Sequence, residues 1–411
     1  MRQTKLNLPK GLLFSALILR LFFSAFFFHP DIKSHHFHAQ FLTRGVVDIY
    51  AYISANLTRL PYRDTFNYPP LTYYLLGSWN AVSRVVLGPD LISWLNDWGP
   101  AGYSHPRMFE FMLVLKLPYL ILDFLIGFML LRFNRRSDTN LLLAGFWFFN
   151  PVSLYAIYML SQFDVICAAL TVFALLQTKD RRLFPAALAL GLGTMLKSYP
   201  LLLLPFVLFR SVNLRQLSTA LIGFFLGLLL PLLPVIASPE FYYTMSHSNL
   251  MQRVFAAGIE IGGAQKLPIF VIIYALTLWL SWGRKKLTDL LPEFLTVTLS
   301  VLLVAHFHAQ WAIWSLPFVA VVFARCSPAR TWPVFVAAAA GFFLTNILLY
   351  DQYAFLGLFS PLNPLAMVFP PLPEMVSGFI DPVLLQSLAH TLLTGSGLWL
   401  LYFAWKNYAV E

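Results

Sequence analysis

Twelve apolar segments are the feature that most constrains what this chain can fold into. A membrane-spanning helix needs about 20 consecutive, mostly apolar residues, and no polar stretch between these segments is long enough to form a soluble domain. The sequence therefore predicts one all-α, polytopic integral membrane domain over residues 1–411, with about 12 transmembrane helices. The segments lie at residues 10–28, 107–131, 141–159, 164–178, 184–197, 199–209, 217–236, 268–283, 289–305, 311–325, 332–349 and 382–405.

The composition agrees with a membrane protein and argues against nucleic acid as a partner. Apolar residues make up 59% of the chain and charged residues 11%, against roughly a quarter charged in soluble proteins. The net charge of +10 comes from short basic clusters between the apolar segments, a pattern typical of orientation by the positive-inside rule. Cys167 and Cys326 have neither metal nor redox spacing. Arg2, Lys5 and Lys10 precede the first apolar segment without a small-x-small cleavage site after it, so we expect that segment to remain as the first transmembrane helix.

One further apolar stretch, Tyr68–Leu87, decides the predicted topology. It begins with a double proline and is interrupted by Asn80, Ser83 and Arg84. If this stretch crossed the membrane, every later loop would change sides and the basic clusters would face outward. An interfacial or re-entrant helix instead places most Lys and Arg residues on one side. We therefore expect both termini in the cytoplasm and residues 29–106 as one large, helical extracytoplasmic loop.

Asp31 is the carboxylate of greatest interest, because it follows Pro30 directly after the first apolar segment. Apolar residues after it recur with helical spacing. Two interpretations fit this position: an N-cap of an amphipathic surface helix, or a general base at the membrane surface. His35, His36 and His38 follow closely, but no carboxylate or cysteine completes a metal site at plausible spacing. We therefore predict no metal.

Ionisable residues within membrane spans are costly and point to function by default. Arg20 and Asp123 fall at comparable depth on the first two spans, which favours a structural ion pair. Asp164 and Lys197 fall at outer ends of spans, on the side of Asp31. Lys116 lies deeper, where a lysine can reach outward along its stem or meet a lipid phosphate.

Two other outer segments carry polar candidates. In the sequence HFHAQWAIW, His306 and His308 occupy a turn between two spans, and they fit either interfacial side chains or a shared cavity. In PYRDTFNYPPLTYY, Arg63 and Asp64 precede a Tyr-Pro-Pro step that forces an extended chain. That step would turn the end of the loop back toward the membrane.

The order of five motifs resembles a known superfamily. The motifs are NYPPLTYYLLGSWNAV, MFEFMLVLKLPYLILDFLIG, GFWFFNPVSLYAIYMLSQFDVICAAL, GLGTMLKSYPLLLLP and HFHAQWAIWSLPF. Their order over residues 10–325 resembles that of the GT-C superfamily of polyprenyl-phosphate-sugar-dependent glycosyltransferases. The similarity is greatest to the dolichyl-phosphate-glucose glucosyltransferases and their bacterial relatives. On this reading residues 107–236 complete a GT-C module, and residues 237–411 are more variable C-terminal helices.

The resemblance implies a site and a reaction. It implies an inverting transfer on the extracytoplasmic side, a lipid-linked sugar donor, a catalytic aspartate that falls on Asp31, a lysine that falls on Lys197 and a histidine that falls on His308. Where eukaryotic members have a His-Glu-Lys turn, this chain has His308-Ala309-Gln310. The identity of the sugar therefore stays open.

The residue inventory fits that chemistry. A phosphate leaving group is already a stable anion and needs no general acid, so one base suffices where a glycosidase uses two carboxylates. We expect a hexosyltransferase, glucosyl or mannosyl, without a cofactor, whose partners are a polyprenyl-phosphate-sugar, a glycan or glycolipid acceptor and the bilayer. The compact length suggests a prokaryotic plasma membrane. The expected donor phosphate contacts are Lys197, His306, His308, Lys116 and Arg63, and the expected acceptor or sugar contacts are His35, His36, Asp64, Tyr68, Gln162 and Asp164.

A transporter or flippase for lipid-linked precursors is the alternative. Twelve spans suit a transporter equally well, but the chain shows no inverted repeat and no discontinuous helices in corresponding halves. Transfer of a labelled sugar by the purified protein separates the two hypotheses.

Overall fold

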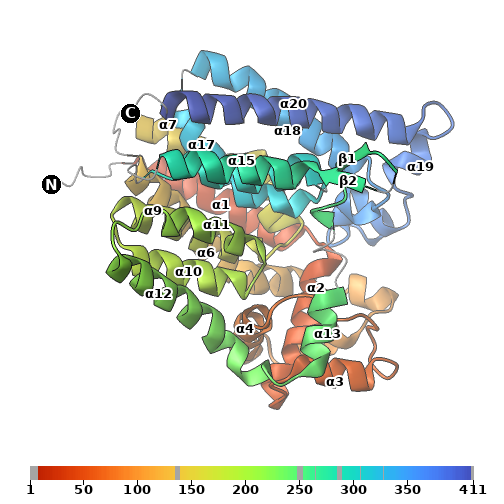
Figure 1. Ribbon diagram of the computed structural model, residues 1–411. Coiled ribbons are helices and arrows are strands. Elements are labelled where there is room, and N and C mark those ends of the chain that lie inside the picture. Colours follow the sequence, from red (N-terminus) through yellow and green to blue (C-terminus); the bar gives the residue numbers. More distant parts are fainter. Residues whose placement is uncertain are drawn as a thin grey trace.

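The structure is a bundle of helices in which all twelve predicted apolar segments are helical (Figure 1). This computed structural model describes residues 8–134, 139–247, 253–263, 265–284, 289–305, 307–326 and 328–408. The helices of the bundle are α1 (Lys10–Phe26), α6 (Met108–Phe133), α7 (Asn140–Phe148), α9 (Asp164–Lys179), α10 (Leu183–Thr194), α11 (Tyr199–Leu208), α12 (Leu214–Leu232), α15 (Ile269–Gly283), α16 (Leu291–Ser300), α17 (Ala312–Arg325), α18 (Pro328–Ile347) and α20 (Pro382–Tyr408).

Length and apolarity qualify three stretches of the described chain as membrane spans: Met108–Phe133, Asn140–Met159 and Leu214–Val235. The pair Lys10–Phe26 and Pro30–Arg44 also qualifies when taken together, although it is bent by 78°. Five shorter apolar helices accompany them. The protein is thus a helical membrane protein, and the count of about twelve spans stays a prediction.

Several of the apolar segments are broken, each at an identifiable residue. The predicted segment 141–159 is interrupted at Asn150, between α7 and the short α8 (Pro151–Leu154). Asn150 caps α8, because its Oδ1 accepts hydrogen bonds from the backbone N–H groups of Val152 and Ser153. A π-helical turn, η4 (Tyr155–Met159), follows. A second π-helical turn, η6 (Val301–Ala305), ends the helix begun by α16. Such turns shift the register of a helix and are frequent at functional sites.

The first loop is helical, as predicted, and its extracytoplasmic location stays a prediction. It contains α2 (Pro30–Ala39), η1 (Gln40–Arg44), α3 (Ile49–Asn56), α4 (Pro70–Leu87), α5 (Asp90–Asn96) and η2 (Pro100–Tyr103). The stretch that decided the predicted topology is α4, which packs on α2 and η1. Gly77 allows this close approach, because a Cβ there would lie 2.6 Å from the carbonyl oxygen of Ala39.

The described chain is helical, as predicted, with one small addition. Between α13 (Pro239–His247) and α15, strands β1 (Gly258–Ile261) and β2 (Gln265–Pro268) form an antiparallel hairpin that pairs Gly258 with Pro268 and Ile261 with Gln265. Gly262 and Gly263 have φ of 38° and 80°, a conformation that glycine adopts at little cost. The remaining short elements are η5 (Leu233–Val235), η7 (Ala309–Trp311), η8 (Gln352–Ala354), η9 (Leu356–Phe359), η10 (Pro364–Met367) and α19 (Leu372–Val376).

Buried ion pairs join helices that are distant in the sequence. Arg20 Nε on α1 lies 2.6 Å from Asp123 Oδ2 on α6, and both side chains are fully buried. The predicted pairing of Arg20 with Asp123 is therefore confirmed. In a second buried pair, Arg210 Nη2 lies 2.9 Å from Glu293 Oε1.

A second hydrophobic cluster holds α2 in place. It consists of Phe28, Ile32, Leu87, Leu91, Trp94, Leu95, Met108, Phe111, Met112 and Leu115. Beside it Lys33 is fully buried, lies over the rings of Trp94 and Trp98, and donates to the carbonyl oxygen of Asp97. The helix that carries Asp31 is therefore fixed by apolar packing and by a cation–π contact with the same cluster.

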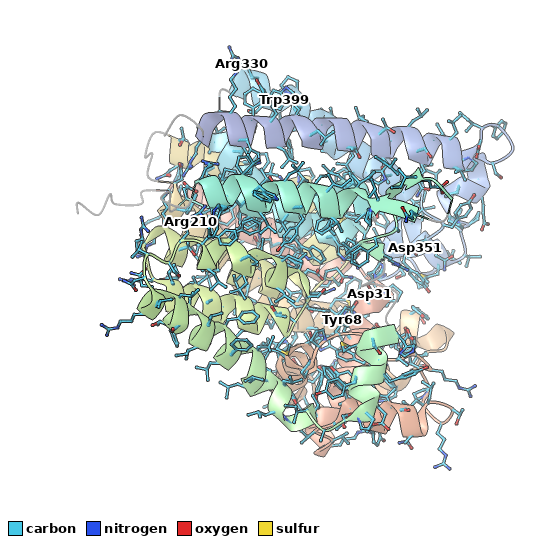
Figure 2. All side chains as sticks on the ribbon, in the orientation of Figure 1. Asp31, Tyr68, Arg210, Arg330, Asp351 and Trp399 are labelled. Carbon is cyan, nitrogen blue, oxygen red and sulfur yellow. The ribbon has the colours of Figure 1, made fainter. Side chains whose placement is uncertain are left out.

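The view in Figure 2 separates the two ends of the bundle. Asp31, Tyr68 and Asp351 lie near one end, and Arg210 lies near the other. In Figure 1, α1 begins and α20 ends on the side of Arg210. Asp31 and Tyr68 of the first loop thus lie at the same end of the bundle as Asp351.

Candidate active site

Asp31 lies in the first turn of α2 and does not cap it. Pro30 occupies the first helical position, where its missing N–H costs nothing. Because a residue before proline is driven toward extended conformations, His29 has φ −129° and ψ 139° and becomes the N-cap. Its Nδ1 accepts a hydrogen bond from the backbone N–H of Asp31 at 3.3 Å. The N-cap interpretation of Asp31 is therefore wrong, since the cap is the residue two positions earlier.

The carboxylate of Asp31 is held from both sides. Gln162 Nε2 donates to Oδ2 at 2.6 Å, and His29 Nδ1 lies 3.5 Å from Oδ1. The side chain keeps 34% of its surface exposed. A substrate hydroxyl can therefore reach a carboxylate whose orientation is already set.

Gln162 reaches Asp31 because the chain before it is unusual. The π-helical turn η4 ends at Met159, and Ser161 then adopts φ 59°, a left-handed conformation uncommon for a residue with a side chain. Gln162 also donates to the carbonyl oxygen of Leu160 at 3.0 Å. A π turn and a left-handed residue directly before the Asp31 contact fit the tendency of functional sites to store backbone strain.

A histidine and a second carboxylate set the charge of Asp31. Burial raises the pKa of the Asp31 carboxyl, but the groups around it, among them His29, the Gln162 hydrogen bond and Lys197, lower it more, so the pKa lies below its ordinary value. Burial lowers the pKa of His29, but Asp31 and Asp351 raise it more, and the net pKa lies above its ordinary value. The Nε2 of His29 is 3.9 Å from Asp351 Oδ2. Asp31 is therefore ionised at neutral pH, as a general base must be.

The three histidines of α2 point to different partners. The His35 ring lies edge-on against Tyr68 and Phe163, with centroids 5.1 and 5.0 Å away. His36 Nδ1 is 2.6 Å from Asn80 Oδ1, and His38 Nε2 is 3.0 Å from the carbonyl oxygen of Asp64.

These histidines are neutral, because burial lowers their pKa values to about 3 for His35, about 4 for His36 and about 4 for His38. They shape the wall of the site and add no positive charge. His35, through its contact with Tyr68, stands nearest to the cavity described next.

Lys197 brings a cation to the same region. Its Nζ lies 3.3 Å from Asp164 Oδ2 and over the rings of Tyr68 and Phe163, at 4.3 and 4.7 Å. Asp164 Oδ1 accepts from Trp314 Nε1 at 2.6 Å. Lys197, Tyr68 and Trp314 line a cavity of about 110 Å³. The structure thus gathers Asp31, Gln162, His35, Tyr68, Lys197 and Asp164, which come from four separate stretches of the sequence.

Other predicted residues lie farther from the carboxylate. Lys116 is fully buried, and its ammonium donates to the carbonyl oxygens of Phe27 and Tyr158, both at 2.7 Å. Arg63 is exposed, and the exposed carboxylate of Asp64 accepts from Tyr62 and from the Thr65 N–H.

His308 lies next to the cavity beside Lys197, because it contacts Trp311, which lines that cavity. Trp311 in turn stacks on Trp314. The Nε2 of His308 is 2.6 Å from Arg253 Nη1. His306 lies outside the described residues. The roles predicted for these residues remain predictions.

The sequence reading missed His29, Asp351, Arg253 and Trp314. A signal for His29 was present, because a histidine immediately before proline and two residues before an aspartate can cap the helix and face the carboxylate. Asp351 lies 320 positions after Asp31 in the sequence, and nothing local indicates that the two share a histidine. Arg253 and Trp314 likewise become neighbours of the site only through tertiary packing.

The fold and the site define an integral membrane protein with a polar, partly open site at one end of its helix bundle. Comparison with protein families identifies the class: the model of glycosyltransferase family 87 matches residues 108–350. The chain belongs to this family and is a membrane glycosyltransferase. No curated protein matches the chain.

The matched region places part of the site within the family. It begins at the first residue of α6 and includes Gln162, Asp164 and Lys197, whereas Asp31 precedes it. The enzyme class decides between the two hypotheses drawn from the sequence in favour of the transferase and against the transporter or flippase.

Proposed function

We propose that this enzyme transfers a hexose from a polyprenyl-phosphate-hexose to an acceptor hydroxyl, with inversion at the anomeric carbon, and that Asp31 is the general base. The site would face the extracytoplasmic side, with both termini in the cytoplasm. A prokaryotic plasma membrane remains our expectation for its location. The proposal needs neither a metal nor a cofactor.

The observation that carries the proposal is that Asp31 and Lys197 border one site, close enough for the Lys197 charge to lower the pKa of Asp31. Asp31 is ionised, partly exposed and held by Gln162. His35 contacts Tyr68, and Tyr68 in turn lies beneath the Lys197 ammonium. A base and a cation that border the same site are what a displacement at a glycosyl phosphate needs.

In the proposed reaction the acceptor oxygen attacks the anomeric carbon of the donor. A new C–O bond forms while the bond from that carbon to the phosphate oxygen breaks, and the bonding electron pair leaves with the phosphate. The acceptor proton passes to Asp31. A single displacement inverts the anomeric configuration, and no group needs to protonate the phosphate.

Lys197 would stabilise the charge that grows on the departing phosphate. Its ion pair with Asp164, itself held by Trp314, orients the ammonium before substrate arrives. A preorganised cation in a partly closed site acts more strongly than one in water. The Tyr199 and Trp314 rings, stacked at 4.2 Å, line the same cavity and offer an apolar wall to the first isoprene units of the donor.

The test is transfer by the purified protein from a panel of labelled polyprenyl-phosphate hexoses. We expect Asp31→Asn to lower turnover by about 10³-fold, because the amide keeps the size and can still bond Gln162 but cannot accept the proton. Donor binding should be retained.

Asp90→Asn is the matched control. Asp90 belongs to the same loop, is half exposed and pairs with Arg107, and we expect this variant to keep normal turnover. Near-normal transfer by Asp31→Asn would exclude Asp31 as the base. Movement of the intact lipid-linked sugar across the proteoliposome membrane, with no transfer of the sugar to an acceptor, would contradict the proposed reaction.

A further inference from the structure

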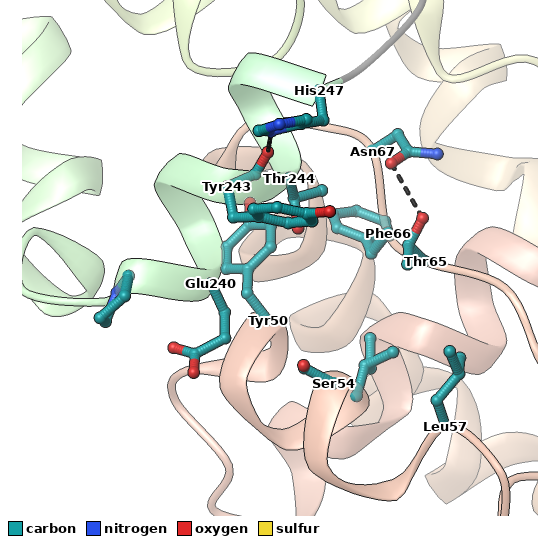
Figure 3. Close-up of a pocket in the computed structure, with 12 residues that line it drawn as sticks. Tyr50, Ser54, Leu57, Thr65, Phe66, Asn67, Glu240, Tyr243, Thr244 and His247 are labelled. Atoms are coloured by element: carbon teal, nitrogen blue, oxygen red, sulfur yellow. Dashed lines mark hydrogen bonds between the residues drawn. The ribbon is translucent and has the colours of Figure 1, made fainter.

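A second cavity, about 450 Å³ in volume, lies between α3 and α13 (Figure 3). The first loop supplies one wall and the segment after α12 the other, so two distant parts of the sequence form it. Its volume falls within the range of sites for small ligands. None of the groups assigned above to the chemistry lines this cavity.

Both aromatic rings and polar side chains line this cavity. Tyr243 is 65% exposed, and its ring stacks on His247 with centroids 4.1 Å apart and planes at 21°. Figure 3 shows Glu240 from α13 and Ser54 from α3 at the lower edge, with their oxygens pointing into the space between the helices. Flat rings that pack against C–H faces, next to oxygens that bond hydroxyls, suit a pyranose.

The cavity adjoins the candidate active site. Asn67 lines both this cavity and the one beside Lys197. Phe66, also in the wall, contacts Tyr68 and His38 with centroid distances of 5.5 and 5.7 Å. One layer of rings therefore separates the cavity from the side chains around Asp31.

The charged residues that line the cavity indicate which class of ligand it can bind. Among the described residues that line the cavity, Glu240 is acidic and none is lysine or arginine. A carboxylate without a neighbouring cation repels a phosphate. An isoprenoid or acyl chain would suit instead the apolar cavity of about 290 Å³ lined by Phe23, Phe343 and Phe359.

We infer that the cavity between α3 and α13 binds a neutral sugar unit of the acceptor glycan, adjacent to the unit whose hydroxyl is glycosylated. This inference rests on the proposed function. Since the ring layer of Phe66 and Tyr68 stands between this cavity and Asp31, the sugar bound here is not the one that reacts. The preferred acceptor therefore contains at least two sugar units, and its remote unit contributes binding energy that positions the reacting hydroxyl.

The experiment measures binding and transfer separately, on the full-length protein in lipid nanodiscs. Binding of methyl glycosides of glucose and mannose, as mono-, di- and trisaccharides, is followed by saturation-transfer NMR without donor. We expect a disaccharide of at least one series to bind more tightly than its monosaccharide. Tyr243→Ala should weaken that binding about tenfold, the effect of losing roughly 1.4 kcal/mol of contact, and Glu240→Gln should weaken it less.

Tyr242→Ala is the matched control. Tyr242 is also exposed and lies next to Tyr243 on α13, but it does not line the cavity. In transfer assays Tyr243→Ala should raise the acceptor KM about tenfold at an unchanged donor KM, whereas Tyr242→Ala should change neither. Exposure of both side chains keeps the fold intact, which size-exclusion chromatography checks.

The outcomes separate the two proposals. Equal effects of Tyr243→Ala and Tyr242→Ala, or no saccharide binding by the unsubstituted protein, would overturn the inference. Saccharide binding that depends on Tyr243, in a protein that transfers no hexose from any polyprenyl phosphate, would support the cavity as a sugar site and refute the proposed donor. Transfer with equal efficiency to mono- and disaccharides would refute the two-unit acceptor alone.

Discussion

Asp31, His29 and Asp351 form a short electrostatic series at the edge of the site. His29 stands between the two carboxylates, with Nδ1 3.5 Å from Asp31 and Nε2 3.9 Å from Asp351. When His29 is neutral, its Nδ1 accepts from the backbone of Asp31, and when it is protonated the same nitrogen can donate to a carboxylate. One imidazole therefore couples the start of α2 to the ionisation of the proposed base.

Replacement of His29 tests this coupling through the pH dependence of transfer. In the proposed mechanism activity requires ionised Asp31, so activity should fall as the pH drops through the Asp31 pKa. Because His29 lowers that pKa, His29→Asn should move the acidic limb of the kcat/KM profile to higher pH. Asparagine still serves as an N-cap, which keeps the start of α2.

His105→Asn provides the control for this shift. His105 Nδ1 likewise accepts from the backbone N–H two residues later, that of Arg107, at 3.2 Å. Its substitution should leave the acidic limb in place. A uniform loss of activity in His29→Asn without movement of the limb would show that His29 acts only on structure.

At the scale of elements, the position of Asp31 depends on how α1 is anchored. Arg20 of α1 bonds Asp123 of α6, and it also donates to the carbonyl oxygen of Phe148 at 2.7 Å. Tyr158 of the π turn donates to the same carboxylate at 2.8 Å. The pair therefore links the helix before Asp31 with the segment that leads to Gln162.

Removal of one partner from this pair should destabilise the protein strongly. We expect Asp123→Leu to lower the free energy of unfolding by about 3–5 kcal/mol, because it leaves Arg20 buried and unpaired. The double variant Arg20→Leu/Asp123→Leu should lose less, since no charge remains buried. Unfolding in mixed micelles, followed by circular dichroism, measures both. Equal losses in the single and double variants would contradict a buried charge as the cause.

The break between α1 and α2 also positions Asp31. Pro30 cannot continue the helix, and the 78° bend between α1 and α2 turns the chain out of the bundle. The sequence showed the proline and the helical spacing beyond it, so both helices were predictable. The direction of the bend was not, because it depends on the packing of Phe28 and Ile32 against α5 and α6.

For the whole molecule, the topology can be tested by cysteine labelling. The native Cys167 and Cys326 are both buried, so single exposed cysteines report their own side. With the first loop outside, Thr58→Cys should react with an impermeant maleimide in intact cells, and Arg182→Cys should react only after the membrane is opened. The opposite pattern would place the site in the cytoplasm and would contradict an extracytoplasmic reaction.

Both positions suit the comparison, because both residues are exposed, Thr58 in the turn after α3 and Arg182 directly before α10. Transfer activity of each variant confirms that the labelled protein is folded. The labelling result is independent of donor identity, so it tests sidedness alone.

The sequence by itself determined the membrane class, the location of every long helix, the helical first loop and the pairing of Arg20 with Asp123. These follow from apolar length and from the cost of an isolated charge in lipid, which act locally along the chain. It also singled out Asp31, Gln162 and Lys197, although not how they meet.

Only the tertiary structure decided which side chains face Asp31. It assigned the N-cap to His29, brought Asp351 to the same imidazole, turned the three histidines of α2 toward separate partners, and opened the cavity between α3 and α13. The physical reason is that these contacts join residues far apart in the sequence. Their geometry is set by helix breaks and by packing between uniformly apolar surfaces, and no residue pattern encodes either one locally.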